Sequence, residues 1–291
     1  MSYKPSELIV NNDGSIFHLK LLPEDISENI ILVGDPGRVD LISGFFDSIE
    51  VEKQNREFKT VTGYYNKKRL TVISSGIGTD NIDIVINELD ALANVDLEKR
   101  TDKNEFKKLN IIRLGTSGAI QEDIPVGSFV ASKKSVGFDN LLFFYDIAPG
   151  NEDMADELKR QLTWPEKQPF PYIVDASNQL INLFDKEVLK GINISAPGFY
   201  GPQGRQLRIP LAYPNGNNII EKFEFKDHKI TNYEMESSAI YGLSKYLNHN
   251  ALTICVIIAN RMTKEYAGDY KPMVKKLVKL VLDKLTKSQS E

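Results

Sequence analysis

The sequence predicts an α/β fold with a largely buried, mixed or parallel sheet. Four short apolar runs are typical of strands. They occupy residues 29–34, 70–78, 109–120 and 251–261. Segments with the apolar spacing of helices alternate with these runs. Because strands that are apolar on both faces must be covered on both sides, the pattern indicates layers of helices around a sheet.

The first two strands each lead into a helix. Asp35 follows the first strand and is suited to cap a helix, and Pro36 fits the first helical position. The second strand ends in glycines. An amphipathic helix follows it, with Thr79 or Asp80 predicted as its cap.

The remaining elements follow the same signals. The third strand is predicted to run into a glycine-punctuated turn, and alternation over residues 126–139 predicts a more exposed strand. Helical spacing returns at 232–247 and at 271–285. In the last segment the apolar face consists of Val274, Leu277, Val278, Val281, Leu282 and Leu285.

A single domain is predicted over residues 1–291, because no internal repeat or low-complexity linker interrupts the chain. Two polar stretches, 95–109 and 148–171, are predicted to be surface excursions. The first is heavily charged, and the second contains a short helix bounded by prolines.

Composition excludes several classes of function. A net charge of −4 over 291 residues and a pI near 5.6 argue against nucleic acid as a partner. The lone cysteine, Cys255, lies in an apolar run and is predicted to be a buried small hydrophobe. The polar start of the chain and the shortness of its apolar runs predict a cytoplasmic protein without a signal peptide or a membrane partner.

Three glycine-containing strand ends predict an anion site, because ligands of open α/β sheets bind at the carboxyl ends of strands. Segments 34–38 and 113–118 each combine glycines with an arginine, and 76–78 ends a third strand. An arginine near the end of an apolar strand is costly unless it meets a carboxylate or a phosphate. Arg38 and Arg113 are therefore predicted to hold one oxyanion between two loops. Ordinary salt bridges of the two arginines remain the alternative.

Segment 232–237, NYEMES, is predicted to open a helix with two glutamates. Positions i and i+2 do not share a helix face, so one glutamate points to a site while the other is a charge near the helix dipole. Two ordinary glutamates at a helix start are the alternative.

Other chemistries find no support in the sequence. Neither a P-loop nor a dinucleotide fingerprint is present. The three histidines, His18, His228 and His249, show no metal spacing and no defensible catalytic triad. His18 is expected in an early exposed strand.

Segment 198–206, GFYGPQGRQ, is predicted to be a loop, because three glycines and a proline cannot hold a helix or a central strand. The loop displays an aromatic pair, Phe199 and Tyr200, beside the flat polar groups of Gln203 and Arg205. The residues alone leave the use of this combination open.

Six segments, in this order, resemble the nucleoside phosphorylase family, and within it the uridine phosphorylases most closely: ILVGDPGRV, NREF, SSGIG, IIRLGTSGAI, FYGPQGR and NYEMES. The resemblance covers nearly the whole chain. It implies one α/β domain around a mixed, distorted sheet, and it makes the two polar stretches insertions relative to the bacterial pattern. It also implies homodimers that assemble into a homohexamer, with each site completed by a neighbouring subunit.

The resemblance also implies the site residues. Those on phosphate are Gly34, Arg38, Arg113 and Thr116 of one subunit and Arg56 of the next. Those on the ribose are Met235, Glu236 and His18, of which His18 crosses the interface to the 5′-hydroxyl. Those on the base are Phe199, Gln203, Arg205 and Arg261. The residues that the resemblance implies to be catalytic are Arg113, Gln203, Arg205 and Glu236.

The implied reaction is reversible phosphorolysis of uridine to uracil and ribose 1-phosphate, with phosphate as co-substrate and no cofactor. Gln203 offers an acceptor and donors that can meet N3–H and a carbonyl of uracil together, and Arg205 offers only donors. A purine nucleoside phosphorylase, a nucleosidase that uses water and a non-catalytic nucleoside-binding protein remain alternatives.

Three departures from the family pattern bear on specificity. Purine-directed members carry an aspartate where this chain has Asn260, which favours a pyrimidine, because an amide cannot act as a general acid. Asn81 stands where bacterial uridine enzymes have a serine of a potassium site, whereas Glu57 and Ile77 match that site. Monovalent-cation binding is therefore left open. Segment 148–171 is a candidate to cover the base end.

Overall fold

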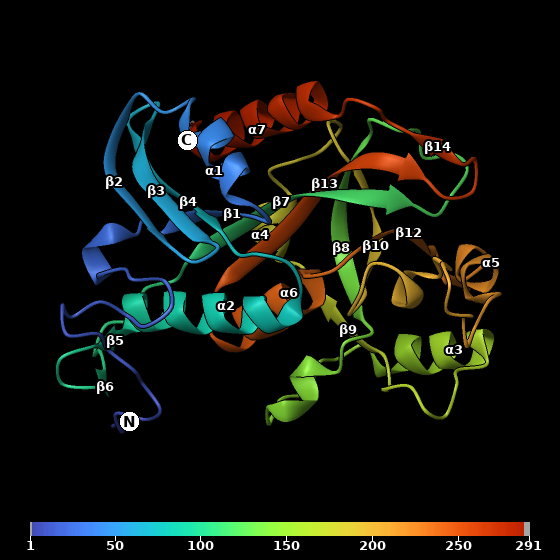
Figure 1. The fold of residues 1–291 in the computed structure, drawn as a ribbon, viewed down its shortest axis with the longest axis horizontal. Helices are drawn as coiled ribbons and strands as arrows, with labels where there is room; N and C mark the ends of the chain where they lie inside the picture. The colour runs from blue at the N-terminus through green and yellow to red at the C-terminus, as the bar shows by residue number, and fades with distance from the viewer. Residues whose placement is uncertain (1, 288–291) are drawn as a thin grey trace.

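The computed structural model describes residues 2–287, which form an α/β fold around one mixed sheet of 12 strands. The order of the main path is β11-β12-β10-β8-β13-β7-β1-β4-β3-β2, with β14 on β13 and β9 on β8. Figure 1 shows α1 and α7 on one side of the sheet and α2 and α6 on the other. No described helix is long and apolar enough to cross a membrane.

The elements have the following bounds. The strands of the large sheet are β1 (Asn29–Val33), β2 (Ser48–Asn55), β3 (Phe58–Tyr65), β4 (Lys68–Ser74), β7 (Asn110–Ala119), β8 (Phe129–Gly137), β9 (Tyr172–Asp175), β10 (Leu189–Ser195), β11 (Glu224–Phe225), β12 (His228–Glu234), β13 (Asn250–Asn260) and β14 (Glu265–Tyr266). A separate hairpin consists of β5 (Val95–Asp96) and β6 (Thr101–Asp102). The helices are α1 (Pro36–Ser43), α2 (Thr79–Asn94), α3 (Glu152–Leu162), α4 (Asn178–Ile181), α5 (Gly216–Glu221), α6 (Ser237–Tyr246) and α7 (Lys271–Thr286), with short 3₁₀ turns η1 (Pro23–Asp25), η2 (Leu141–Phe144) and η3 (Gly201–Gln203).

The sheet closes on itself at one end. β12 pairs antiparallel with the far end of β7, where Asn232 faces Ala119 and Tyr233 faces Gly118. Strands β7, β13, β8, β10 and β12 therefore form a closed ring, while β1, β4, β3 and β2 extend from it as an open sheet. This closure brings the end of β12 to the end of β7.

The predicted strands 29–34, 70–78 and 251–261 are confirmed, with small differences at their ends. Asp35 caps α1, since its carboxylate accepts the backbone N–H of Arg38 at 3.0 Å. The cap of α2 is Gly78 instead of Thr79 or Asp80. Its φ of 96° is a backbone conformation that favours glycine.

The predicted strand in 109–120 is confirmed, but its glycines do not form the predicted turn, because β7 continues through them to Ala119. It pairs in parallel with β13 from Asn110 to Ala119, and this non-local pairing overrides the local glycine signal. At Gly115 the absence of a side chain is required, since an added Cβ would lie 2.1 Å from a guanidinium nitrogen of Arg113. The glycine thus makes room for the arginine.

Three further expectations are corrected. β8 is a core strand between β10 and β13, with only its two lysines facing outward, instead of an exposed strand. Residues 232–234 end β12, so α6 begins only at Ser237. Segment 148–171 is more than a surface excursion, because the apolar face of α3 is buried in a second core cluster.

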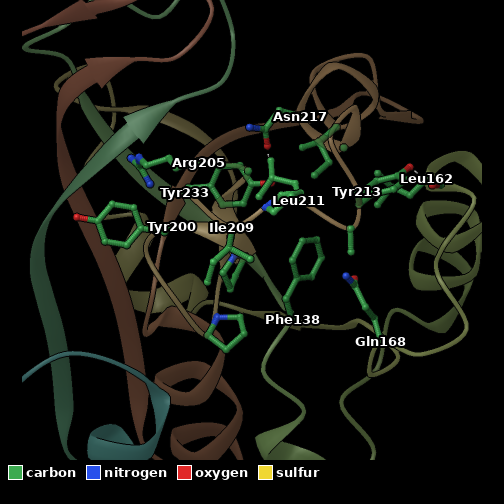
Figure 2. Close-up of a pocket in the computed structure, with 18 of the residues that line it drawn as sticks. Phe138, Leu162, Gln168, Tyr200, Arg205, Ile209, Leu211, Tyr213, Asn217 and Tyr233 are labelled. Atoms are coloured by element: carbon green, nitrogen blue, oxygen red, sulfur yellow. Dashed lines mark hydrogen bonds between the residues drawn. The ribbon is translucent and has the colours of Figure 1, made fainter. Parts of the chain in front are cut away.

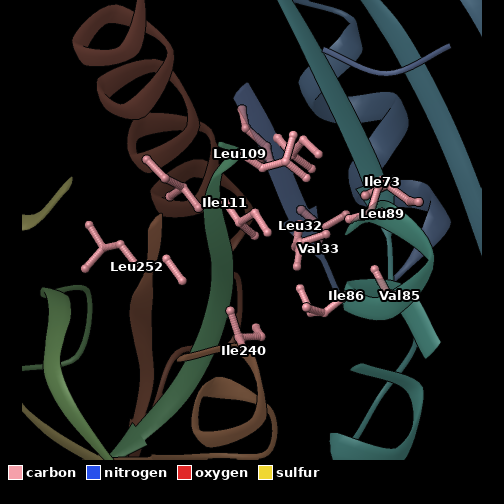
Figure 3. Close-up of a cluster of buried hydrophobic side chains, with 14 of the residues drawn as sticks. Leu32, Val33, Ile73, Val85, Ile86, Leu89, Leu109, Ile111, Ile240 and Leu252 are labelled. Atoms are coloured by element: carbon pink, nitrogen blue, oxygen red, sulfur yellow. The ribbon is translucent and has the colours of Figure 1, made fainter. Parts of the chain in front are cut away.

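The main core lies where β1 and β7 meet α2 and α6. Figure 3 shows Leu32 of β1, Ile86 of α2 and Ile111 of β7 packed in one cluster. Fully burying side chains of this kind stabilises the fold by roughly 1.5–3 kcal/mol each. The core therefore holds β1 and β7 against α2. The predicted apolar face of α7 is also confirmed.

Candidate active site

The centre of the site is a buried arginine on β7. Arg113 is 5% exposed, and its Nη2 donates a hydrogen bond to the carboxylate of Glu236. Its Nη1 lies 3.5 Å from Oε2 of Glu234. Its Nε has no hydrogen-bond partner in the described part of the chain. Because an unpaired buried donor is costly, this N–H favours a ligand that accepts.

The two glutamates at and just after the end of β12 make different contacts. Glu234 accepts the backbone N–H groups of Glu236 at 2.9 Å and Ser237 at 3.0 Å, so it is the negative charge at the start of α6. Glu236 turns toward Arg113 and accepts the N–H of Gly78 at 3.0 Å. The half-buried Met235 lies between them, and its N–H donates to Glu236 at 3.2 Å.

Burial and the oppositely charged neighbours act in opposite directions on the pKa values of Arg113 and Glu236. Burial alone would lower the pKa of Arg113, but the carboxylates of Glu236 and Glu234 raise it above its ordinary value. Burial raises the pKa of Glu236 against the opposing pull of Arg113, and repulsion from Glu234 adds to the rise. Two carboxylates thus face one guanidinium, so an anion bound here needs further positive charge.

Arg38, on α1, reaches the same strand. Its Nη1 donates to the carbonyl of Leu114 at 3.3 Å, and its Nη2 lies 3.0 Å from the carboxylate of Asp35. The ion pair with Asp35 agrees with the salt-bridge alternative, but half of the Asp35 side chain is exposed, and exposed pairs are weak. Gly34 adjoins Gly76, since an added Cβ would lie 3.8 Å from the Gly76 carbonyl. The ends of β1 and β4 therefore meet beside the arginine pair.

β7 connects the group around Arg113 and Arg38 to a second group of side chains. Thr116 is half-buried, in contrast to its buried neighbours along the strand. At Gly118 an added Cβ would lie 3.6 Å from Cγ of Arg261. Five residues of strand separate Arg113 from Gly118, a distance of about 16 Å. The strand therefore spans from the predicted phosphate residues to a predicted base residue.

The predicted base residues of the loop lie together. Oε1 of Gln203 accepts a hydrogen bond from Nη1 of Arg205 at 2.6 Å, and the same Nη1 donates to the carbonyl of Phe199 at 2.6 Å. Gln203 is only 3% exposed. The guanidinium carbon of Arg205 lies 3.8 Å from the centroid of the Phe199 ring, so one face of this ring is covered. A stacked base would have to use the other face.

Arg261 lies next to this loop and has no counter-ion among the described residues. Its guanidinium is 5.4 Å from the ring centroid of Tyr233, and its buried Nη1 has no hydrogen-bond partner among the described residues. Burial and then the neighbouring Arg261 lower the pKa of Arg205 to about 10. Since no described carboxylate pairs with either arginine, both favour a ligand rich in acceptors.

His18 and Arg56 form a separate group at the edge of the molecule. The expectation of a strand around His18 is wrong, because His18 lies in a turn, with Nδ1 2.6 Å from the Glu88 carboxylate. Asn55 donates to the His18 carbonyl at 2.7 Å, which ties His18 to the exposed turn that carries Arg56. Within the described chain neither His18 nor Arg56 forms a hydrogen bond or ion pair with Arg113.

The implied monovalent-cation site does not fit the side chains as they lie. Asn81 donates its amide N–H to Glu57 at 3.3 Å, and an N–H donor is not a cation ligand. The Ile77 side chain is 66% exposed. Among the described residues no group of three or more His, Cys, Asp or Glu could hold a metal ion.

Asn260 is committed to the fold. Its amide donates to the carbonyls of Gln121 at 2.8 Å and Ile124 at 3.0 Å. Its carbonyl accepts the backbone N–H groups of Met262 at 2.9 Å and Thr263 at 3.1 Å. All the hydrogen-bonding groups of this side chain therefore hold the turns after β7 and β13, which leaves none for a leaving base.

Two supporting residues of the loop were missed from the sequence. Tyr233 donates its hydroxyl to the amide oxygen of Asn217 at 3.1 Å, and Asn217 donates to the Gln203 carbonyl at 3.2 Å. Gly204, with φ of 67°, allows this approach, since an added Cβ would lie 2.5 Å from the Asn217 amide nitrogen. No local signal reveals Asn217, because its segment has the composition of a turn.

Replacing Asn217 is expected to lower kcat/KM for the nucleoside more than kcat/KM for phosphate. Asn217→Ala removes the hydrogen bond that holds the turn carrying Gln203, which costs about 0.5–1.5 kcal/mol, or roughly 2–12-fold in nucleoside kcat/KM. Steady-state kinetics with each substrate varied in turn measures this split. Asn218→Ala, an exposed neighbour on α5, is the matched control. Equal losses for both substrates would contradict a role confined to the base end.

A cavity of about 710 Å³ adjoins the same loop. Figure 2 shows Arg205 and Tyr233 on one side of it and Gln168 and Leu162 on the other. Leu162 and Gln168 belong to segment 148–171, which therefore reaches the loop that carries the predicted base residues.

Comparison with known proteins places this geometry in one family. Residues 28–286 match the model of the phosphorylase superfamily. A uridine phosphorylase of Thermococcus kodakarensis is 27% identical over 260 residues, which cover 87% of this chain and 80% of that protein. A guanosine phosphorylase of Halorubrum lacusprofundi is 25% identical over 254 residues, which cover 86% of each protein.

A solved structure agrees over the whole fold. The crystal structure of a Trypanosoma brucei nucleoside phosphorylase, described as showing uridine phosphorylase activity, matches with a TM-score of 0.85 and 30% identity. The match covers 97% of this chain and 100% of that chain. Because the family model also spans most of its length, this chain belongs to the phosphorylase superfamily.

Proposed function

We propose that this protein catalyses the reversible phosphorolysis of uridine, which yields uracil and ribose 1-phosphate. The observation that carries the proposal is the contact between the buried Gln203 and the half-buried Arg205, in which the amide oxygen accepts from the guanidinium at 2.6 Å. The similarity to a uridine phosphorylase and to a nucleoside phosphorylase with that activity supports the same base.

The pair offers the complement of the uracil edge. With its oxygen directed at Arg205, Gln203 offers a donor at Nε2 and a second lone pair at Oε1, and Arg205 offers a further donor. The resulting order of donor, acceptor and donor matches the acceptor, donor and acceptor of O2, N3–H and O4. Cytosine presents an acceptor at N3 and a donor at N4. It would therefore place an acceptor against the acceptor of Gln203 and a donor against the donor of Arg205.

The anion end suits phosphate as the nucleophile. Arg113 directs an unpaired N–H away from its carboxylate partners, and Arg38 lies against the same strand. Glu236, held by Arg113 and Gly78, is positioned to accept ribose hydroxyls once phosphate engages the guanidinium. Phosphate below C1′ would supply both the attacking oxygen and a charge that stabilises an oxocarbenium-like sugar.

The leaving base needs no proton donor. As the glycosidic bond breaks, negative charge spreads onto O2 and O4 of uracil. The donors of Gln203 and Arg205 stabilise that charge, and Arg261 adds a second cation nearby. Preorganised donors of this kind contribute most when they are buried, as Gln203 is.

We also propose that Arg56 and His18 complete the site of a neighbouring subunit in a homodimer or larger assembly. Both lie in turns, and in the described part of their own chain neither forms a hydrogen bond or an ion pair with Arg113. Mixing an Arg56→Ala chain with a Glu236→Ala chain is expected to restore partial activity, because some mixed sites draw both intact residues. Mixed oligomers that stay inactive would indicate that each site is built from one chain.

Dependence on phosphate separates the proposal from a nucleosidase. With uridine as substrate, uracil release is expected to be at least about 100-fold faster with phosphate than without it, since bound phosphate is the nucleophile. Equal rates in the two conditions would favour hydrolysis by water. Binding of uracil without any turnover would instead favour a non-catalytic binding protein.

A further inference from the structure

The cavity beside the loop has a lining separate from the proposed nucleoside site. It lies between segment 197–213, the end of α3 and α5. None of Arg113, Glu236, Gln203 and Phe199 lines it. Its volume of about 710 Å³ falls within the range of small-molecule sites. Only Arg205 belongs both to this cavity and to the predicted base residues.

Aromatic rings form much of the wall. The Phe138 and Trp164 ring centroids are 4.8 Å apart, and both rings line the cavity together with Tyr213 and Tyr233. Trp164 is fixed by its indole N–H, which donates to the Pro169 carbonyl at 3.0 Å. Flat rings in such positions favour a flat apolar ligand, because aromatic pairs gain from offset or edge contacts.

The charged residues of the lining are all positively charged. Arg205 and Arg208 line the cavity, and no acidic residue lines it in the described part of the chain. Neither arginine pairs with a described carboxylate. Arg208 is exposed at the mouth, beside the exposed apolar side chains of Leu207 and Ile209. A ligand here therefore meets an apolar interior and a cationic rim.

We propose that this cavity is a second binding site, for a flat aromatic anion. The aromatic body would lie between Trp164, Phe138 and Tyr213, and the anionic group would meet Arg208 at the rim. Guanidinium groups bind carboxylates through charge-assisted hydrogen bonds, which are stronger than neutral ones. The site is additional to the proposed uridine site and does not depend on the identity of the nucleoside.

Trp164 is the single tryptophan of the chain, so its fluorescence reports on this cavity alone. Titration of the full-length protein with trans-cinnamate is expected to give a saturable change in tryptophan emission. Cinnamyl alcohol, which has the same ring but no charge, should bind on the order of 10-fold more weakly, since hydrogen bonds to a charged group are the stronger ones. No saturable change with either compound, or equal affinity for both, would overturn the proposal.

Two arginine variants test the charge assignment. Arg208→Gln is expected to lower the affinity for cinnamate on the order of 10-fold and to leave that for cinnamyl alcohol unchanged. Arg160→Gln, on α3 and outside the lining, should change neither. Saturating uracil with phosphate should leave the cinnamate affinity within a few-fold. Displacement of cinnamate by uracil, or an affinity unaffected by Arg208→Gln, would contradict a separate anion site.

Discussion

Uridine is expected to be cleaved at least about 10³-fold faster than inosine, because a polar site mismatched to its base leaves buried groups unpaired. A purine would also need a proton donor at its leaving nitrogen. Asn260, which stands where such an acid is expected, has all its hydrogen-bonding groups engaged by the backbone of two turns. Comparison of kcat/KM for the two nucleosides at saturating phosphate measures the ratio.

The same prediction extends to a variant of the loop. Gln203→Leu removes both the donor and the acceptor that face uracil. The rate of uridine cleavage should therefore be mostly lost, while the KM for phosphate should change little. Gln206→Leu, an exposed glutamine three residues further along the loop, is the matched control and should behave as the unaltered protein. Inosine cleaved as fast as uridine would show that the pyrimidine assignment is wrong.

Arg113→Ala is expected to lower the free energy of unfolding and to raise the phosphate concentration that the reaction requires. The substitution leaves Glu234 and Glu236 buried without their counter-ion, and breaking a buried pair in this way costs about 3–5 kcal/mol of unfolding free energy. Loss of a charge-assisted contact to phosphate should raise the phosphate requirement by roughly 10–150-fold. Urea unfolding and phosphate kinetics measure the two effects.

Two matched variants separate these effects. Arg113→Lys keeps the charge but loses the planar fork, so it should recover much of the stability and little of the phosphate affinity. Arg160→Ala breaks the exposed pair with Glu157 and is expected to change the unfolding midpoint very little. Normal phosphate kinetics in Arg113→Ala would place the anion site elsewhere.

The stability loss of Arg113→Ala should depend on pH. The pKa of Glu236 in the folded protein is already above its ordinary value, and removing Arg113 removes the main opposing interaction. The folded variant then binds more protons than the unfolded chain between about pH 4.3 and the raised pKa. Its stability therefore increases as pH falls through that window, so the deficit should be smaller at about pH 5.5 than at pH 8. A deficit that grows on acidification would contradict this electrostatic origin.

The local parts of the fold were predictable from the sequence. Asp35 and Pro36 identify the start of α1 through capping chemistry that lies within four residues. The apolar runs identify β1, β4 and β13, because a strand covered on both faces must be apolar throughout. Arg113 could be identified as a candidate site residue for the same reason, since an arginine stands out in such a strand.

The non-local parts were not predictable from these patterns. β7 continues through its glycines because β12 and β13 pair with it, and those partners lie more than 100 residues away. The start of α6 was placed too early for the same reason. Asn217 supports Gln203 only through the folded arrangement of α5 and the loop. The covered face of the Phe199 ring likewise depends on where Arg205 folds back.

Phosphorus NMR of a mixture of uridine, inorganic phosphate and the protein tests the central claim most directly. The account predicts that a ribose 1-phosphate resonance appears in equal amount to the uracil released, at the expense of inorganic phosphate. It also predicts that uracil and ribose 1-phosphate regenerate uridine when supplied together. Uracil that accumulates while inorganic phosphate stays constant would contradict the account, because the anion held near Arg113 would then not be the nucleophile.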